Sequence, residues 1–164
     1  MKSKVFIVFL LALFLTTGIL LGGCAKREPP GKEEIYERFQ DAHSDIQIVL
    51  NYLVQTEYDT IFYPTPDGEV FADFERIPID DTIKDAVHSL IREHNFIRFG
   101  KRIDDNAIAF EMWTDQLECE CGVVYALNKE ILPTVEYLTL LEPLPEDGWY
   151  YYVEDYNEWR RNNS

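Results

Sequence analysis

The chain has 164 residues, of which 46% are hydrophobic and 14% aromatic, and it holds 15 Lys and Arg against 30 Asp and Glu, a formal net charge of −15. This length fits one domain of ordinary size, and the hydrophobic content argues against a disordered chain. The excess of acid argues against a nucleic-acid binder and against a domain that docks on anionic lipid, because both surfaces repel negative charge.

The N-terminal segment has the layout of a secretory signal. Lys2 and Lys4 form a short positive start, and residues 5–15 are apolar without a break. After a second short apolar stretch comes Leu21-Gly22-Gly23-Cys24, in which small residues precede a cysteine. A charged start, an apolar run and small residues at a cleavage point are the three parts of a signal peptide.

The Leu-Gly-Gly-Cys end of this segment resembles the lipobox of bacterial lipoproteins. The resemblance implies cleavage before Cys24, a diacylglyceryl group with palmitate-type chains on its thiol, and a protein held on the extracytoplasmic face of the cell membrane. We therefore expect a signal peptide at 1–23, a lipidated cysteine with a short tether at 24–31, and one domain at 32–164. An uncleaved membrane helix stays as the alternative, because residues 5–21 lie at the short limit of a span.

Two amphipathic helices are predicted in the mature chain. Apolar residues recur every three or four positions over 32–55, which predicts one long helix with one buried face. Asp80-Asp81-Thr82 offers N-cap side chains for a second helix that ends near His94, and its apolar residues follow the helical period from Ile83 onward.

The remaining segments favour strands. Residues 60–63 and 69–71 flank the turn signal Asp67-Gly68 and predict a small hairpin, while later alternating segments predict a run of strands. These later segments are 96–102, 107–114, 118–127, 134–141 and 149–153. Tyr156 and Trp159 are expected in one helical turn against the sheet.

This order predicts an α+β domain with two amphipathic helices packed on one face of a curved antiparallel sheet of about four to six strands. The order of elements is similar to that of the NTF2-like superfamily. That superfamily contains both enzymes and binding modules, so the resemblance does not imply one function.

Cys119-Glu120-Cys121 places two thiols on one face of a predicted strand. Alternate residues of a strand lie about 6.6 Å apart, too far for a disulfide unless the strand has a bulge. Two thiolates bind soft ions such as Cu(I), yet no third Cys or His lies near enough in the sequence to complete a zinc set. Small core side chains, a bulge-assisted disulfide and a metal or redox pair stay open as alternatives.

Aromatic residues are dense at 149–152. Strand alternation places Tyr150 and Tyr152 together on one face, which is exposed unless the first helix or the turn at Trp159 covers it. An exposed tyrosine pair stacks on a sugar ring or anchors a protein partner. Together with Trp113, these two tyrosines are the candidate binding surface.

No catalytic motif is present in the sequence. His43, His88 and His94 lack a spaced partner, and the patterns of the nucleophile elbow, the P-loop and the dinucleotide-binding glycines are absent. Acidic pairs such as Asp80-Asp81 and Asp104-Asp105 lack calcium-loop spacing and fall where Asp caps turns and helices. We therefore predict no metal and no cofactor. Glycosidase carboxylates meet in space and not in sequence, so that alternative stays open.

The sequence thus favours a membrane-anchored binding or interaction module of the cell envelope, with an envelope protein or a small ligand as partner. An immunity-type lipoprotein that meets a basic toxin by charge complementarity is one version. The alternatives are an envelope enzyme with a cavity site and a metal-handling lipoprotein that uses Cys119 and Cys121. The enzyme predicts a strongly shifted pKa in a deep pocket, whereas buried thiols would argue against metal handling.

Overall fold

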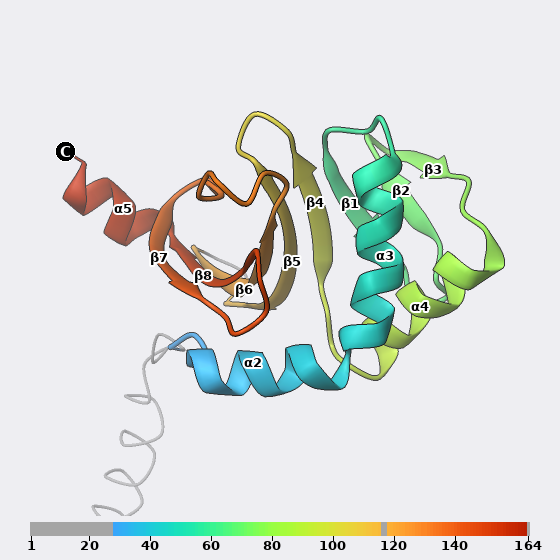
Figure 1. The fold of residues 1–164 in the computed structure, drawn as a ribbon, viewed down its shortest axis with the longest axis horizontal. Coiled ribbons are helices and arrows are strands. Elements are labelled where there is room, and N and C mark those ends of the chain that lie inside the picture. Colours follow the sequence, from blue (N-terminus) through green and yellow to red (C-terminus); the bar gives the residue numbers. More distant parts are fainter. Residues whose placement is uncertain (1–27, 116–117, 164) are drawn as a thin grey trace, which may run out of the picture.

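The computed structural model describes residues 28–115 and 118–163, so the lipobox-like segment lies outside the described residues. The described chain is an α+β domain with four helices and one open eight-stranded antiparallel sheet (Figure 1). The strand order is β3-β2-β1-β4-β5-β6-β8-β7, and the half of the sheet that contains β5 to β8 is strongly curved. The α+β class is confirmed.

The helices are α2 (Lys32–Asp41), α3 (His43–Gln55), α4 (Asp81–Arg92) and α5 (Tyr156–Asn162). The strands are β1 (Ile61–Pro64), β2 (Val70–Ala72), β3 (Glu75–Ile77), β4 (Arg98–Arg102), β5 (Ala107–Thr114), β6 (Cys119–Ala126), β7 (Leu138–Pro143) and β8 (Trp149–Asp155). The predicted hairpin is present as β1 and β2, and β5 has the predicted bounds. The predicted second helix is α4, where Asp80 Oδ1 accepts a 2.9 Å hydrogen bond from the backbone N–H of Ile83.

The prediction of one long first helix is wrong. The helix breaks at Ala42, whose φ and ψ are −96° and 4°, and α2 and α3 run in different directions (Figure 1). The Ala42 N–H still donates to the Arg38 carbonyl, and the Ile46 N–H donates to the Ala42 carbonyl. Because the buried stripe continues through the break, the apolar period could not reveal it.

The count of four to six strands and two helices is also too low. The extra strand β3 has only three residues and follows β2 through a turn in which Asp73 and Phe74 have positive φ angles of 50° and 67°. No glycine marks this turn, although positive φ usually favours one. The C-terminal turn is the helix α5, whose Trp159 ring lies 5.3 Å from the ring of Tyr137.

The main core lies between α2, α3, α4 and one face of the sheet. Its largest fully buried side chains include Phe39, Phe62, Phe99 and Phe110. A second, smaller cluster lies on the other face, where Ala107, Val124 and Tyr152 pack with partly buried side chains from the β6–β7 connection and β7. Those covering side chains are Val135, Leu138 and Leu141.

Polar groups tie the ends of elements together. Lys101 of β4 is 5% exposed, and its Nζ donates to the carbonyls of Val54 and Thr56 at 3.3 and 2.6 Å. These carbonyls lie at the C-terminal end of α3, where helix carbonyls lack a partner within the helix. A buried lysine therefore fixes the end of α3 to the sheet.

The start of the domain is fixed on β8. The hydroxyl of Tyr151 donates a 2.8 Å hydrogen bond to the carbonyl of Pro30, and Lys32 forms a 3.3 Å ion pair with Glu142 of β7. The residues that precede α2 are therefore held against the curved half of the sheet.

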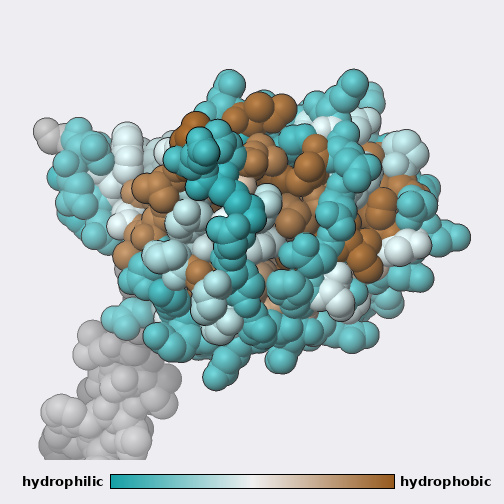
Figure 2. All heavy atoms as spheres, in the orientation of Figure 1, coloured by the Kyte–Doolittle hydropathy of each residue, from teal (hydrophilic) through white to brown (hydrophobic). Residues whose placement is uncertain are grey.

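Hydrophilic side chains cover most of the face shown in Figure 2, and hydrophobic ones gather over the upper loops. The exposed large apolar side chains in loops include Ile103, Ile131, Leu132 and Phe74. Among the described residues, no helix is both long enough and apolar enough to cross a membrane.

Candidate functional site

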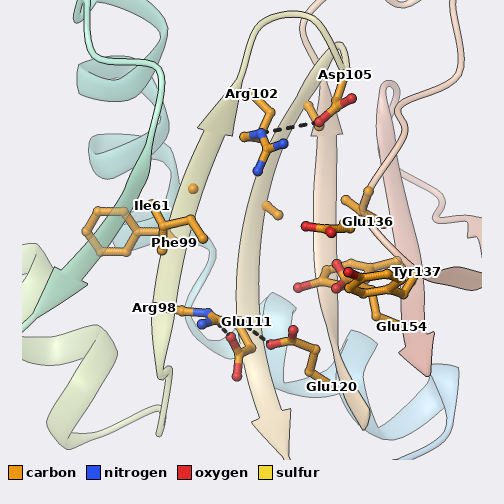
Figure 3. Close-up of a pocket in the computed structure, with 15 residues that line it drawn as sticks. Ile61, Arg98, Phe99, Arg102, Asp105, Glu111, Glu120, Glu136, Tyr137 and Glu154 are labelled. Atoms are coloured by element: carbon orange, nitrogen blue, oxygen red, sulfur yellow. Dashed lines mark hydrogen bonds and ion pairs between the residues drawn. The ribbon is translucent and has the colours of Figure 1, made fainter. Parts of the chain in front are cut away.

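Four charged side chains form a row across neighbouring strands on the face of the sheet opposite the main core. They are Arg98 of β4, Glu111 of β5, Glu120 of β6 and Glu154 of β8 (Figure 3). Arg98 lies directly opposite Glu111 in the strand register, and Glu120 lies directly opposite Glu154. Strand alternation explains the common face, because the neighbours of these residues in each strand point into the core.

The close approach of β5 and β6 sets this geometry. Gly122 pairs with Glu111, and a Cβ atom at Gly122 would lie 2.0 Å from the carbonyl oxygen of Phe110. The register shifts directly after this pair, between Glu111 and Trp113. Only glycine allows this approach.

The guanidinium group of Arg98 forms ion pairs with two of these carboxyl groups. Arg98 Nη2 lies 2.5 Å from Glu120 Oε2, and Arg98 Nε forms an ion pair with Glu111 Oε2. The carboxyl group of Glu120 also lies near those of Glu111 and Glu154, and it raises the pKa of both. Two carboxyl groups in close contact favour a state in which one of them carries a proton.

Burial raises the pKa of Glu111 to about 8, and the neighbouring Glu120 adds to this rise while Arg98 opposes it. Burial also raises the pKa of Glu154 to about 9, again with Glu120 adding to the rise. Both groups therefore hold a proton at neutral pH. The row then carries little net charge, because Arg98 balances the remaining carboxylate.

These residues line a cavity of about 140 Å³. This volume is far above the ~10–15 Å³ that one water molecule needs. Ala107, Ala109 and Val135 give the cavity an apolar wall. Arg102 and Asp105, joined by a 3.3 Å ion pair, lie at the far end of the lining from Glu111 (Figure 3).

Tyr152 lines the same cavity and is 2% exposed. Burial and the nearby carboxyl groups raise the pKa of its hydroxyl well above 10.0. Within residues 28–115 and 118–163, no side chain or backbone group hydrogen-bonds to this hydroxyl, whose oxygen is not enclosed by protein but open to the cavity. A buried tyrosine hydroxyl usually has one, so the cavity offers an unused polar group.

The three residues predicted to form one binding surface lie on two opposite faces of the sheet. Tyr150 and Tyr152 share a face, as expected, but Trp113 packs on the opposite face against the main core. The tyrosines are covered by side chains of the β6–β7 connection and β7, and not by the first helix or the turn at Trp159. Of the three residues, Tyr152 alone lines the cavity.

Cys119 and Cys121 point away from the cavity into the main core. Both are buried and are not joined in a disulfide. Burial raises the pKa of the Cys121 thiol to about 12, so the thiolate that a metal needs is disfavoured. The described part of the chain contains no group of three His, Cys, Asp or Glu that could hold a metal ion. Of the segment Cys119-Glu120-Cys121, only Glu120 belongs to the site.

The three histidines lie elsewhere. His43 packs its ring 5.1 Å from that of Phe39, His88 is an exposed residue of α4, and His94 follows that helix. None of them lines the cavity. A role for His88 or His94 in this site is therefore not supported.

Arg98 and Glu111 are not among the site residues predicted from the sequence. A signal was present in β5, where the face opposite Ile108 and Phe110 carries the small residues Ala107 and Ala109 and then a charged one, Glu111. A charge on an otherwise apolar central strand marks a polar site only once its strand neighbours are known.

No family model, curated protein or solved structure matches this chain. The similarity of its element order to that of NTF2-like proteins stays a prediction.

Proposed function

We propose that this protein is a lipid-anchored binding module of the cell envelope, and that its ligand site is the cavity lined by Arg98, Glu111, Glu120 and Glu154. One observation carries the proposal: the nearly buried Tyr152 lines this cavity, and no described residue hydrogen-bonds to its hydroxyl, which is open to the cavity. Buried polar groups are nearly always satisfied, so an unpaired one beside an open cavity indicates a missing partner.

The short tether supports the anchored form of the proposal. Only five residues separate Cys24 from Pro30, whose carbonyl is bound by Tyr151. The six residue-to-residue steps from Cys24 to Pro30 span at most about 20 Å when fully extended. A diacylglyceryl group on Cys24 would therefore keep the cavity close to the bilayer.

The anchor is tested by the mass of the mature N-terminus. Full-length protein made in a bacterial host should fractionate with membranes, and its N-terminal peptide should begin at Cys24 with a diacylglyceryl adduct. The Cys24→Ala variant should keep residues 1–23 and carry no lipid. A wild-type protein that also keeps residues 1–23 would contradict the anchor.

The cavity is tested by filling it. Ala109 lies on the cavity wall, and Ala109→Leu adds three carbons there. Wild-type protein dialysed against a small-molecule extract of its host should retain a compound that mass spectrometry detects, and the variant should lose it. Equal retention by both proteins would contradict this cavity as the site.

A second candidate function is an acid–base enzyme of the envelope. The raised pKa values of Glu111 and Glu154 in one cavity are the sign that this alternative predicts. A protonated Glu154 beside Glu120 provides an acid and a base for hydrolysis of a neutral substrate such as a glycoside. The enzyme predicts turnover of chromogenic glycosides that Glu154→Gln abolishes, whereas a binding module leaves its ligand chemically unchanged.

A further inference from the structure

The cavity lining has more acid than base. It contains five acidic residues, Asp105, Glu111, Glu120, Glu136 and Glu154, and two basic ones, Arg98 and Arg102. Arg102 pairs with Asp105, and Arg98 pairs with Glu111 and Glu120. Among the residues that the structure describes, Glu154 has no ion-pair partner, although it directly faces Glu120. The lining therefore has three more acidic than basic side chains.

Protons on Glu111 and Glu154 offset two of these three negative charges. Glu111 and Glu154 keep their protons to about pH 8 and about pH 9 because burial and Glu120 disfavour further negative charge. A bound cation would relieve the same repulsion. It would replace a proton between Glu120 and Glu154 and leave both groups ionised.

The unpaired hydroxyl of Tyr152 is a second, independent sign of a ligand. This side chain is 2% exposed and lines the cavity beside Glu154, two residues along β8 on the same face. A primary ammonium group has three N–H donors. Glu120, Glu154 and Tyr152 supply three oxygen acceptors for them, and the tyrosine ring supplies a face that attracts cations.

The apolar part of the cavity wall favours a ligand with a hydrocarbon portion. Ala107, Ala109 and Val135 offer apolar surface, which suits a hydrocarbon chain and not a hydrated ion. No group of three metal-ligating side chains occurs in the described ranges. An anion would meet the excess of carboxyl groups and be repelled.

We propose that the cavity binds a small organic ammonium ion, with the ammonium group between Glu120, Glu154 and the Tyr152 hydroxyl and the hydrocarbon chain against Ala109 and Val135. This inference rests on the proposed function, because it names the ligand class of the same site. It adds a testable order of preference: cation over neutral molecule over anion.

Isothermal titration with three probes of matched shape tests this preference. Full-length protein, purified from membranes in a non-ionic detergent, is titrated at pH 8 with pentylamine, pentanol and pentanoate, and each probe is also titrated into detergent alone. Pentylamine should bind at least about tenfold more tightly than pentanol, because a hydrogen bond to a charged group is worth more than a neutral one. Pentanoate should not bind detectably.

Three variants locate the ammonium group. Glu154→Gln keeps the shape of the side chain and should weaken pentylamine binding by about tenfold or more, and Tyr152→Phe should weaken it several-fold. Glu37→Gln removes an exposed carboxylate of α2 on the other side of the molecule and should leave binding unchanged. Circular dichroism should show that all three variants are folded.

The outcomes separate this inference from the proposed function. Equal binding of pentanol and pentylamine, preference for pentanoate, or unchanged affinity in Glu154→Gln would each overturn the ammonium ligand. If none of the probes binds while a host compound is still retained by the cavity, the ligand class is wrong and the binding module stands. If neither a probe nor a host compound is retained, both proposals fail.

Discussion

At the scale of single residues, Gly122 decides how closely β5 and β6 approach beside the carboxyl row. A Cβ atom there would lie 2.0 Å from a backbone oxygen, whereas a Cβ atom at Gly100 would meet its nearest neighbour, a side-chain carbon of Ile61, at 3.7 Å. Gly122→Ala should lower the free energy of unfolding by about 2–3 kcal/mol, because backbone must move. Gly100→Ala should change it by less than about 0.5 kcal/mol. Urea denaturation of the two variants checks the difference, and equal effects would contradict it.

The protons held by Glu111 and Glu154 link stability to pH. The folded protein keeps them above the ordinary pKa of 4.5, up to about 8 and about 9, while the unfolded chain loses them. The free energy of unfolding should therefore fall as pH rises from about 5 to about 9. Glu154→Gln should make the slope of the unfolding free energy against pH less steep, by at most about 1.4 kcal/mol per pH unit.

Denaturant titrations between pH 5 and pH 9 measure this slope. Glu37→Gln on α2 is the matched control, because it also removes one carboxylate but at an exposed position. An unfolding free energy that rises with pH, or equal slopes in both variants, would refute buried protonated carboxyl groups in the folded state.

At the scale of elements, α3 is joined to the sheet by the buried ammonium group of Lys101. Lys101→Met keeps the apolar stem but removes the donor to the carbonyls of Val54 and Thr56. The free energy of unfolding should fall by about 1–3 kcal/mol. Lys129→Met, which breaks an exposed ion pair with Asp147, should cost less than about 1 kcal/mol. A thermal melt of each variant compares the two, and a larger loss for Lys129→Met would contradict the role of Lys101.

Elements with a local signal were predictable. The N-cap at Asp80 and the uninterrupted apolar period predicted α4, and strict alternation predicted β5. The break at Ala42 was not predictable, because both helices continue one apolar stripe. Nor was β3, whose turn at Asp73 and Phe74 uses positive φ without glycine.

The candidate site depends on neighbours that sequence does not show. Glu120 and Glu154 are far apart in the chain and meet only because β6 and β8 pair. Alternation could place each acid on a face, but the register decides which acids lie side by side. Alternation predicted Tyr152 on a binding surface, whereas in the structure the β6–β7 connection covers it and it lines the cavity.

At the scale of the whole molecule, the C-terminal helix supports one wall of the cavity. Tyr137 belongs to the β6–β7 connection that lines the cavity, and the Trp159 ring lies 5.3 Å from its ring. Trp159→Ala should therefore loosen the connection and raise amide hydrogen exchange over residues 128–138. Phe74→Ala, which removes a fully exposed ring, should leave exchange there unchanged. Unchanged protection in Trp159→Ala would show that α5 does not support the wall.

The two edge strands of the sheet affect how copies of the protein associate. Unpaired edge strands invite another chain to add to the sheet. Here one edge is β3, only three residues long with exposed Glu75 and Arg76, and the other is β7, which is irregular near Leu138 and ends at Pro143. Short length, charge, irregular register and proline each oppose such pairing. Copies of the protein at high concentration would therefore resist joining edge to edge into aggregates.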